Sequence, residues 1–220
     1  MTIASDPRST ANIAAPLGDR FFRIEGGRPL KGRVKIGGAK NAALPILAAT
    51  LLTSDPVVLT NVPNLADIAT MVEILQSLGA DVQWEPNENK IRVHAEKLTT
   101  TAVRPDLVAK MRASFLVSGP LLARYHRFDI TTPGGCQLGA RPVDVDVRGF
   151  RRMGADVDFT DQTVSASATA LRGARIFMDY PSHTGTENLL MAASLSEGKV
   201  TIVNASCEPE IVALGLMLNR

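Results

Sequence analysis

Residues 131–144 read TTPGGCQLGARPVD and place Cys136 in a stretch rich in glycine and proline. Such residues form turns and surface loops, whereas a free cysteine is usually buried in an apolar core. Arg141 follows shortly after Cys136 in the same stretch. A thiol beside positive charge is reactive, because the thiolate is the nucleophile. The stretch therefore indicates a reactive thiol on an exposed loop.

Polar residues also gather just before three apolar segments. They lie at 37–41 with Lys40 and Asn41, at 110–112 with Arg112, and at 182–188. If each apolar segment is a helix, each polar group marks a helix N-terminus, which attracts phosphate through unpaired N–H groups and the helix dipole. Three such ends related by pseudo-threefold symmetry would converge on one anion site.

Purely structural interpretations also fit several of these features. Gly37-Gly38 could be only a turn, and Thr184 with Glu187 fits a capping box. The run at 141–144 could be an ordinary helix start, with proline in its favoured first turn. His183 is a lone histidine, which is weak evidence for a ligand or a base.

The remaining histidines and cysteines give little sign of chemistry. His94 and His126 lack metal-site spacing with cysteine or aspartate, so we expect neither a metal nor another cofactor. Cys207 follows a predicted strand and is expected to be inert packing. Two cysteines are too few for a disulfide framework, which favours a reducing compartment such as the cytoplasm.

The elements that must position these residues occur in three copies of one plan. Residues 40–82 predict a small-residue helix, a turn, a strand at 57–59, a second helix and a Gly-Ala turn. Residues 111–157 repeat the plan with one helix over 111–126. Residues 186–220 begin it again and stop before the Gly-Ala turn, so we expect a truncated third repeat. Further strands are predicted at 91–96, 163–168 and 174–180.

The two helices of each copy differ in their apolar pattern. The first is apolar all round, which predicts burial, whereas the second is amphipathic. In the first copy the apolar residues of the second helix are Ile68, Met71, Val72, Ile74, Leu75 and Leu78. Buried helices inside a shell of sheet and amphipathic helix predict an α/β prism or barrel whose copies close on one another.

Composition limits the partners. The 220 residues are 45% hydrophobic, and 24 Lys and Arg nearly balance 22 Asp and Glu. This balance favours neither nucleic acid nor an anionic membrane as a partner. No apolar run reaches transmembrane length, and residues 1–20 are small and polar, as in a disordered tail.

Five stretches of the sequence resemble the UDP-N-acetylglucosamine 1-carboxyvinyltransferases. They are GGAKNAALPILAATLL, MRAS, PGGCQLGARPVD, PSHTGTENLLMAAS and EPEIV. The resemblance runs from about residue 22 to 220. It implies two domains, each an inside-out α/β prism of three βαβαββ units. Residues 21–39 would then supply first strands to the second domain, and 40–220 would form the first domain, incomplete at its C-terminus.

The resemblance also implies residue roles. Lys40 and Asn41 match positions that contact phosphoenolpyruvate, and Cys136 matches the cysteine that protonates it and is alkylated by fosfomycin. Arg141 matches a residue that faces the enolpyruvyl phosphate. Positions that hold the UDP-sugar are matched by Arg112, Arg141, Pro142, Val143, Asp144 and Val145. Tyr180, Pro181, Ser182 and His183 match a segment that contacts the nucleotide. This segment usually contains the run Ser-Val-Gly-Ala-Thr, and the present sequence departs from that run.

The implied reaction moves the enolpyruvyl group of phosphoenolpyruvate to the 3'-hydroxyl of UDP-N-acetylglucosamine, the first committed step of bacterial peptidoglycan synthesis. Its base is an aspartate of the second domain, so we expect the 220 residues alone to be inactive. Two alternatives stay open: an enzyme like 5-enolpyruvylshikimate-3-phosphate synthase, or a non-catalytic partial gene product.

We predict that Cys136, and not Cys207, is the activated thiol. A full-length protein that contains this sequence should gain one fosfomycin mass, and UDP-N-acetylglucosamine should accelerate the labelling by closing the loop. Peptide mapping by mass spectrometry checks the position. Labelling at Cys207, or equal labelling of both cysteines with and without the sugar nucleotide, contradicts the prediction.

Overall fold

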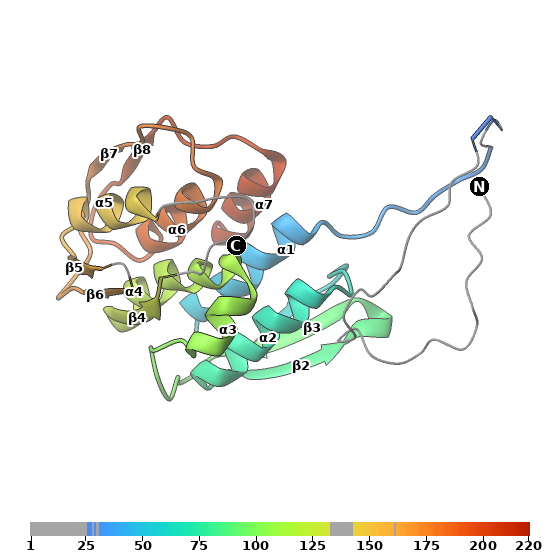
Figure 1. Ribbon diagram of the computed structural model, residues 1–220, viewed down its shortest axis with the longest axis horizontal. Coiled ribbons are helices and arrows are strands. Elements are labelled where there is room, and N and C mark those ends of the chain that lie inside the picture. Colours follow the sequence, from blue (N-terminus) through green and yellow to red (C-terminus); the bar gives the residue numbers. More distant parts are fainter. Residues whose placement is uncertain (1–25, 28, 30, 133–142, 161) are drawn as a thin grey trace. The chain divides into compact units, whose positions relative to one another are not determined.

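The computed structural model describes residues 26, 27, 29, 31–132, 143–160 and 162–220. The chain divides into two units, Met1–Gly37 and Gly38–Arg220, and each is described by itself. The expected tail at 1–20 lies outside the described residues. The second unit holds every helix and strand of the described chain (Figure 1).

The first repeat has the predicted order of elements. Its strands form one antiparallel sheet of order β1-β3-β2, in which the strand predicted at 91–96 is central. Its elements are α1 (Lys40–Ala49), the 3-10 turn η1 (Thr50–Leu52), β1 (Val57–Leu59), α2 (Ala66–Leu78), β2 (Asp81–Glu85), η2 (Pro86–Glu88) and β3 (Lys90–His94).

The second repeat has the same sheet, of order β4-β6-β5. The single helix expected over 111–126 is wrong, because a 3-10 segment precedes a shorter α-helix. Pro120 lacks the N–H of a regular helical turn, and its ring excludes the carbonyl four residues earlier. The elements are α3 (Pro105–Lys110), which was not predicted, η3 (Arg112–Val117), α4 (Ser118–Tyr125), β4 (Arg127–Thr131), α5 (Asp144–Arg152), β5 (Asp156–Phe159) and β6 (Thr163–Ser167).

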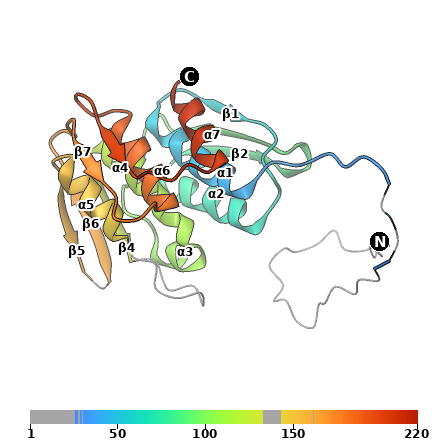
Figure 2. The same cartoon turned by 90° about the horizontal axis from the view of Figure 1, so that it is seen from above.

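The third repeat has a parallel two-stranded sheet within the described residues. Its strands are β7 (Arg175–Phe177) and β8 (Thr201–Val203). The helix α6 (His183–Ala193) lies between them in the chain, and α7 (Pro209–Leu218) follows and packs on α1 and α6 (Figure 2).

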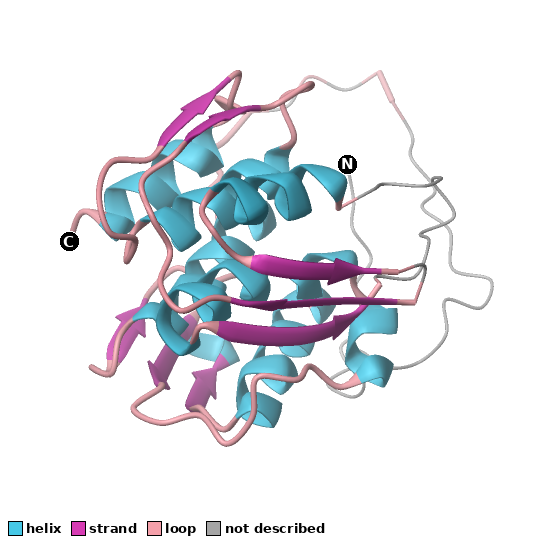
Figure 3. Cartoon of the chain, turned by 90° about the vertical axis from the view of Figure 1, so that its left-hand side faces the viewer, coloured by secondary structure: helices cyan, strands magenta, loops and turns pink. Residues whose placement is uncertain are grey.

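Helices fill the interior of the second unit, and the three groups of strands lie around them (Figure 3). Most residues of α1, α4 and α6 are buried, which confirms the prediction from their apolar sequences. The buried face of α2 consists of the six residues predicted from its spacing, from Ile68 to Leu78. The α/β fold class with repeated helix and sheet units is therefore confirmed.

One arginine ties the second repeat to the first. The guanidinium of Arg124 on α4 donates hydrogen bonds of 2.6–2.9 Å to the carbonyl oxygens of Leu51, Thr53, Ala95 and Glu96. One side chain thus donates hydrogen bonds to four backbone carbonyl oxygens, which lie in a turn and just after a strand. This contact fixes the end of α4 against the end of the first repeat.

Residues 26–39 contain no strand at the positions that the structure describes. Val34 and Ile36 are 84% and 81% exposed. A strand forms only where a neighbouring strand accepts its hydrogen bonds, and none pairs with this segment. The assignment of 21–39 to a second domain stays a prediction. Over the described ranges, no helix is long and apolar enough to cross a bilayer.

Gly119 allows α4 and α6 to pack closely, because a Cβ on Gly119 would lie 2.5 Å from the backbone oxygen of Asn188. We predict that Gly119→Ala lowers the free energy of unfolding by about 1–3 kcal/mol, the usual cost of overpacking. Gly215→Ala is the matched control, since nothing lies within 4 Å of its Cβ position. It should be neutral or stabilising by up to about 1 kcal/mol. Urea unfolding measures both, and a stable Gly119→Ala variant contradicts the close packing.

Candidate active site

A cavity of about 1090 Å³ opens where the first helices of the three repeats begin. It is lined by the starts of α1, η3, α6 and α7. The lining includes the polar residues Lys40, Asn41, Asp67, Lys110, Arg112, Tyr180, Ser182, His183, Thr184, Glu187, Glu208 and Glu210. The predicted convergence of the three helix starts is thereby confirmed.

At the start of α1, both predicted residues line the cavity. Lys40 Nζ lies 2.7 Å from Asp67 Oδ2 of α2, and Asn41 Nδ2 donates to Glu210 Oε1 of α7 over 3.4 Å. Gly38 precedes them at a point where a Cβ would lie 1.8 Å from the carbonyl oxygen of Asn61. Close backbone approach, rather than a turn alone, therefore explains a glycine at this helix start.

Ser182 caps the start of α6. Its Oγ accepts a hydrogen bond from the backbone N–H of Gly185 over 3.2 Å. The capping box proposed for Thr184 and Glu187 is therefore wrong, because both residues lie inside the helix. The capping leaves Ser182, His183 and Thr184 on the cavity wall, at the positive end of a buried helix.

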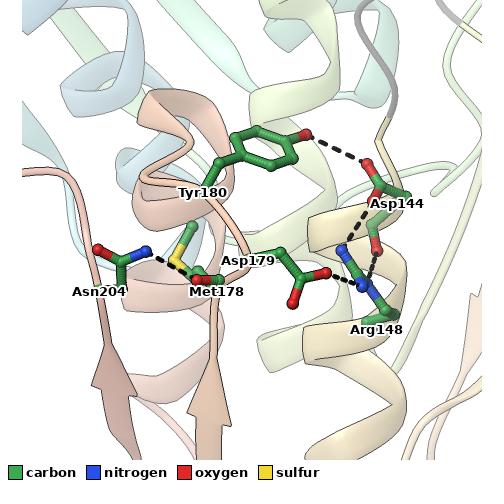
Figure 4. A network of polar contacts seen from close by, with 6 residues as sticks. All are labelled: Asp144, Arg148, Met178, Asp179, Tyr180 and Asn204. Carbon is green, nitrogen blue, oxygen red and sulfur yellow. Dashed lines mark hydrogen bonds and ion pairs between the residues drawn. The ribbon is translucent and has the colours of Figure 1, made fainter.

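A network of polar contacts joins α5 to the segment before α6 (Figure 4). Tyr180 Oη donates to Asp144 Oδ1 over 3.2 Å, and Arg148 donates to Asp144 Oδ2 over 2.8 Å and to Asp179. Burial, then the neighbouring Asp144 carboxylate, raises the pKa of Tyr180, so the phenol stays a hydrogen-bond donor. The contact holds one predicted nucleotide-binding residue against another.

A buried carboxylate lies on α5. Asp146 on α5 is 2% exposed and accepts a 2.8 Å hydrogen bond from Asn188 Nδ2. Asn188 also donates to the carbonyl of Phe115 and accepts from the N–H of Gly119. Burial raises the pKa of Asp146 to about 6, against the hydrogen bond from Asn188 and the charge of Arg112.

The predicted site residues fall into three groups. The cavity brings together Lys40, Asn41, Arg112, Tyr180, Pro181, Ser182 and His183. Val143 and Val145 are buried and Asp144 reaches Tyr180, but none of the three is part of the cavity lining. Cys136, Arg141 and Pro142 lie outside the described residues.

Cys207 is not the packed core residue that was expected, because its side chain is exposed. Its Sγ lies 3.5 Å from the carbonyl oxygen of Ala205 in the turn before α7. The sequence places Cys207 in a turn after a strand, and in the structure the strand β8 already ends at Val203. A reagent that reports accessibility alone would therefore modify Cys207, and selective labelling of Cys136 has to come from activation.

Sequence reasoning missed the acidic part of the cavity wall. Glu187, Glu208 and Glu210 all line the cavity, and Glu187 is 1% exposed. Glu187 lies in a segment that the sequence predicts to be an apolar, buried helix. Because carboxylates are rarely buried without a partner, this position could have indicated a functional residue. Within the described ranges, no three His, Cys, Asp or Glu side chains are arranged to hold a metal ion.

Residues 24–220 match the EPSP synthase (3-phosphoshikimate 1-carboxyvinyltransferase) family, so the chain belongs to this family. It is 50% identical over 199 residues to UDP-N-acetylglucosamine 1-carboxyvinyltransferase 2 of Carboxydothermus hydrogenoformans, covering 90% of this chain and 47% of that protein. It is 49% identical over 202 residues to UDP-N-acetylglucosamine 1-carboxyvinyltransferase of Desulfosudis oleivorans, covering 92% and 48%. These relatives confirm the resemblance seen in the motifs, and the chain spans about half of their length.

Solved structures agree on the fold. The enolpyruvyl transferase NikO from Streptomyces tendae has a TM-score of 0.75 at 22% identity, over 89% of this chain and 46% of that one. EPSP synthase from Acinetobacter baumannii has a TM-score of 0.67 at 18% identity, over 85% and 43%. At these identities the likeness concerns the fold alone.

We predict a pH-dependent effect of Asp146→Asn on stability. The raised pKa means that the folded protein binds the proton between pH 4 and 6 while the unfolded chain releases it, so wild-type stability falls as pH rises through this window. The loss reaches up to about 3 kcal/mol above pH 6. The Asp146→Asn variant keeps an oxygen that accepts the hydrogen bond from Asn188. Because its amide does not titrate, its free energy of unfolding does not fall through this pH window.

The difference between Asp146→Asn and wild type should therefore grow in favour of the variant from pH 4 to 7. Urea unfolding at several pH values measures it. Asp156→Asn on β5, an exposed position, is the matched control and should show no such trend. A difference that does not change with pH contradicts the assignment.

Proposed function

We propose that this chain forms the first domain of an enolpyruvyl transferase that acts on UDP-N-acetylglucosamine. The observation that carries the proposal is the meeting of three helix starts, with Lys40 and Arg112, around one large cavity. Relatives of 46–50% identity that carry this enzyme name support it. We propose further that residues 21–39 belong to a second domain and that the reaction is a cytoplasmic step of peptidoglycan synthesis.

The reaction consists of an addition and an elimination. In the addition, the 3'-oxygen of the sugar bonds to C2 of phosphoenolpyruvate, its proton passes to a base, and C3 receives a proton from the Cys136 thiol. In the elimination, C3 returns a proton to the thiolate that the addition left on Cys136, and the bond between C2 and the phosphate oxygen breaks. Phosphate leaves and the enol ether remains. The base is proposed to be an aspartate of the second domain.

The cations of the cavity have a defined part in this scheme. Lys40, Arg112 and Arg141 are proposed to orient two anionic substrates and to stabilise the charge that develops on the phosphate oxygens. Asn41 offers an amide beside Lys40. Tyr180, Pro181, Ser182, His183 and residues 141–145 are proposed to hold the nucleotide-sugar. We propose no cofactor, because acid, base and fixed charge suffice for these steps.

The alternative substrate is shikimate 3-phosphate, since the matching family is named for that reaction. The two candidates differ in the acceptor alone, so one assay separates them. Phosphate release from phosphoenolpyruvate that depends on UDP-N-acetylglucosamine supports the proposal, whereas dependence on shikimate 3-phosphate replaces it.

We expect the 220-residue chain alone to be inactive. A chimera of this chain with the part of the Carboxydothermus relative that it does not cover should be active. In the chimera, Lys40→Ala should lower the rate by about 10²–10³-fold, the usual effect of removing a group that stabilises developing charge. Lys90→Ala, which removes a lysine paired with Glu85 on the β2–β3 hairpin, is the matched control and should leave the rate unchanged. Activity of the chain alone would falsify the assignment of the base to a second domain.

A further inference from the structure

The wall of the cavity formed by α6 and α7 is acidic where an anionic ligand is proposed to bind. Glu187 belongs to α6, Glu210 to α7, and Glu208 directly precedes α7. Three ionised carboxylates on one wall would repel a nucleotide diphosphate. The charge of this wall therefore decides how well such a ligand binds.

His183 lies between two of these carboxylates. Its Nδ1 is 3.5 Å from Glu187 Oε1, one helical turn further along α6, and its Nε2 is 3.2 Å from Glu210 Oε1. The same Glu210 oxygen accepts a hydrogen bond from Asn41. The imidazole thus contacts both acidic side chains, and Glu210 in turn contacts the start of α1 through Asn41.

Glu187 is the unusual member of this group. It is 1% exposed, and its Oε1 has no hydrogen-bond partner in the described chain. An ionised carboxylate in that position is costly, because neither water nor a donor compensates its charge. Burial, followed by the charges of Glu210, Asp146 and Glu208, raises the pKa of Glu187 to about 8.

The two other carboxylates of this wall, Glu208 and Glu210, stay ionised. Hydrogen bonds from Ser206 and backbone N–H groups lower the pKa of Glu208. The backbone N–H at the start of α7, then Asn41 and His183, lower that of Glu210. The carboxylate of Asp146 acts on Glu187 from α5, and the cavity lining carries the cations Lys40, Lys110 and Arg112 from α1, α3 and η3. Glu187 is therefore the carboxylate of this wall that retains a proton near neutral pH.

We propose that His183 and Glu187 hold one proton between them and that this proton is required for full affinity toward a nucleotide-sugar diphosphate. The inference rests on the proposed function of the cavity. Once the pair loses its proton, the wall gains one negative charge beside the bound diphosphate. Affinity then falls as pH rises, and binding at alkaline pH takes up a proton. His183 and Glu187 thus act as determinants of binding rather than as reacting groups.

Calorimetric titration of the 220-residue chain with UDP-N-acetylglucosamine at pH 6.5, 7.5 and 8.5 tests the proposal. Wild-type affinity should fall about fourfold across this range, with proton uptake visible in buffers of different ionisation enthalpy. Glu187→Gln should bind as the wild type does at pH 6.5 and should keep that affinity at pH 8.5. Glu85→Gln, which removes a carboxylate on β2 outside the cavity lining, should retain the wild-type fall.

Carboxyl ¹³C NMR supplies a readout that needs no ligand. One glutamate signal of the wild type should titrate near pH 8, and this signal should be absent in Glu187→Gln. In His183→Gln the midpoint of this Glu187 titration should change, because the proton is then no longer shared with the imidazole.

The outcomes separate the two hypotheses. Equal pH dependence of affinity in wild type and Glu187→Gln, with wild type binding well, overturns the shared proton and leaves the proposed function intact. An unchanged midpoint of the Glu187 titration in His183→Gln overturns the pair itself. Absence of binding by the wild type at every pH counts against the proposed function of the cavity and against the ligand inferred here, even where the Glu187 midpoint changes in His183→Gln.

Discussion

The arrangement of the cavity depends on one fully buried amide. Asn188 joins α6 to α5 through Asp146, and to the second repeat through the carbonyl of Phe115 and the N–H of Gly119. Each of its polar atoms is satisfied in a place that water does not reach, which fixes the rotation of α6 about its axis. Because His183 and Glu187 lie on the same helix, this rotation also sets what α6 presents to the cavity.

The close approach of α4 and α6 is part of the same constraint. Gly119 leaves room for the backbone of Asn188, and its N–H donates to the Asn188 side chain. A helix contact of this kind leaves little freedom for either helix to slide. The starts of η3 and α6 are consequently held at a fixed separation, and that separation determines the width of the cavity.

Periodicity predicted the features that follow from burial. The buried face of α2, the apolar helices of the three repeats and the meeting of their starts could all be inferred, because each follows from spacing and internal repetition. The interruption between η3 and α4, the Ser182 cap and the exposure of Cys207 depend on local backbone geometry, which periodicity does not report. The pairing of His183 with Glu210 joins residues far apart in the sequence and could not be read from either segment. Cys136, Arg141 and Pro142 stay predictions.

The contact made by Arg124 has a consequence for how the repeats can diverge. All four of its acceptors are main-chain carbonyl oxygens, in Leu51, Thr53, Ala95 and Glu96. Main-chain oxygens are present whatever side chain the residue carries. Substitutions in the first repeat therefore preserve its attachment to α4 as long as the chain keeps its path. A repeat docked in this way is free to accumulate changes, so one copy of the plan can acquire binding residues that its neighbours lack.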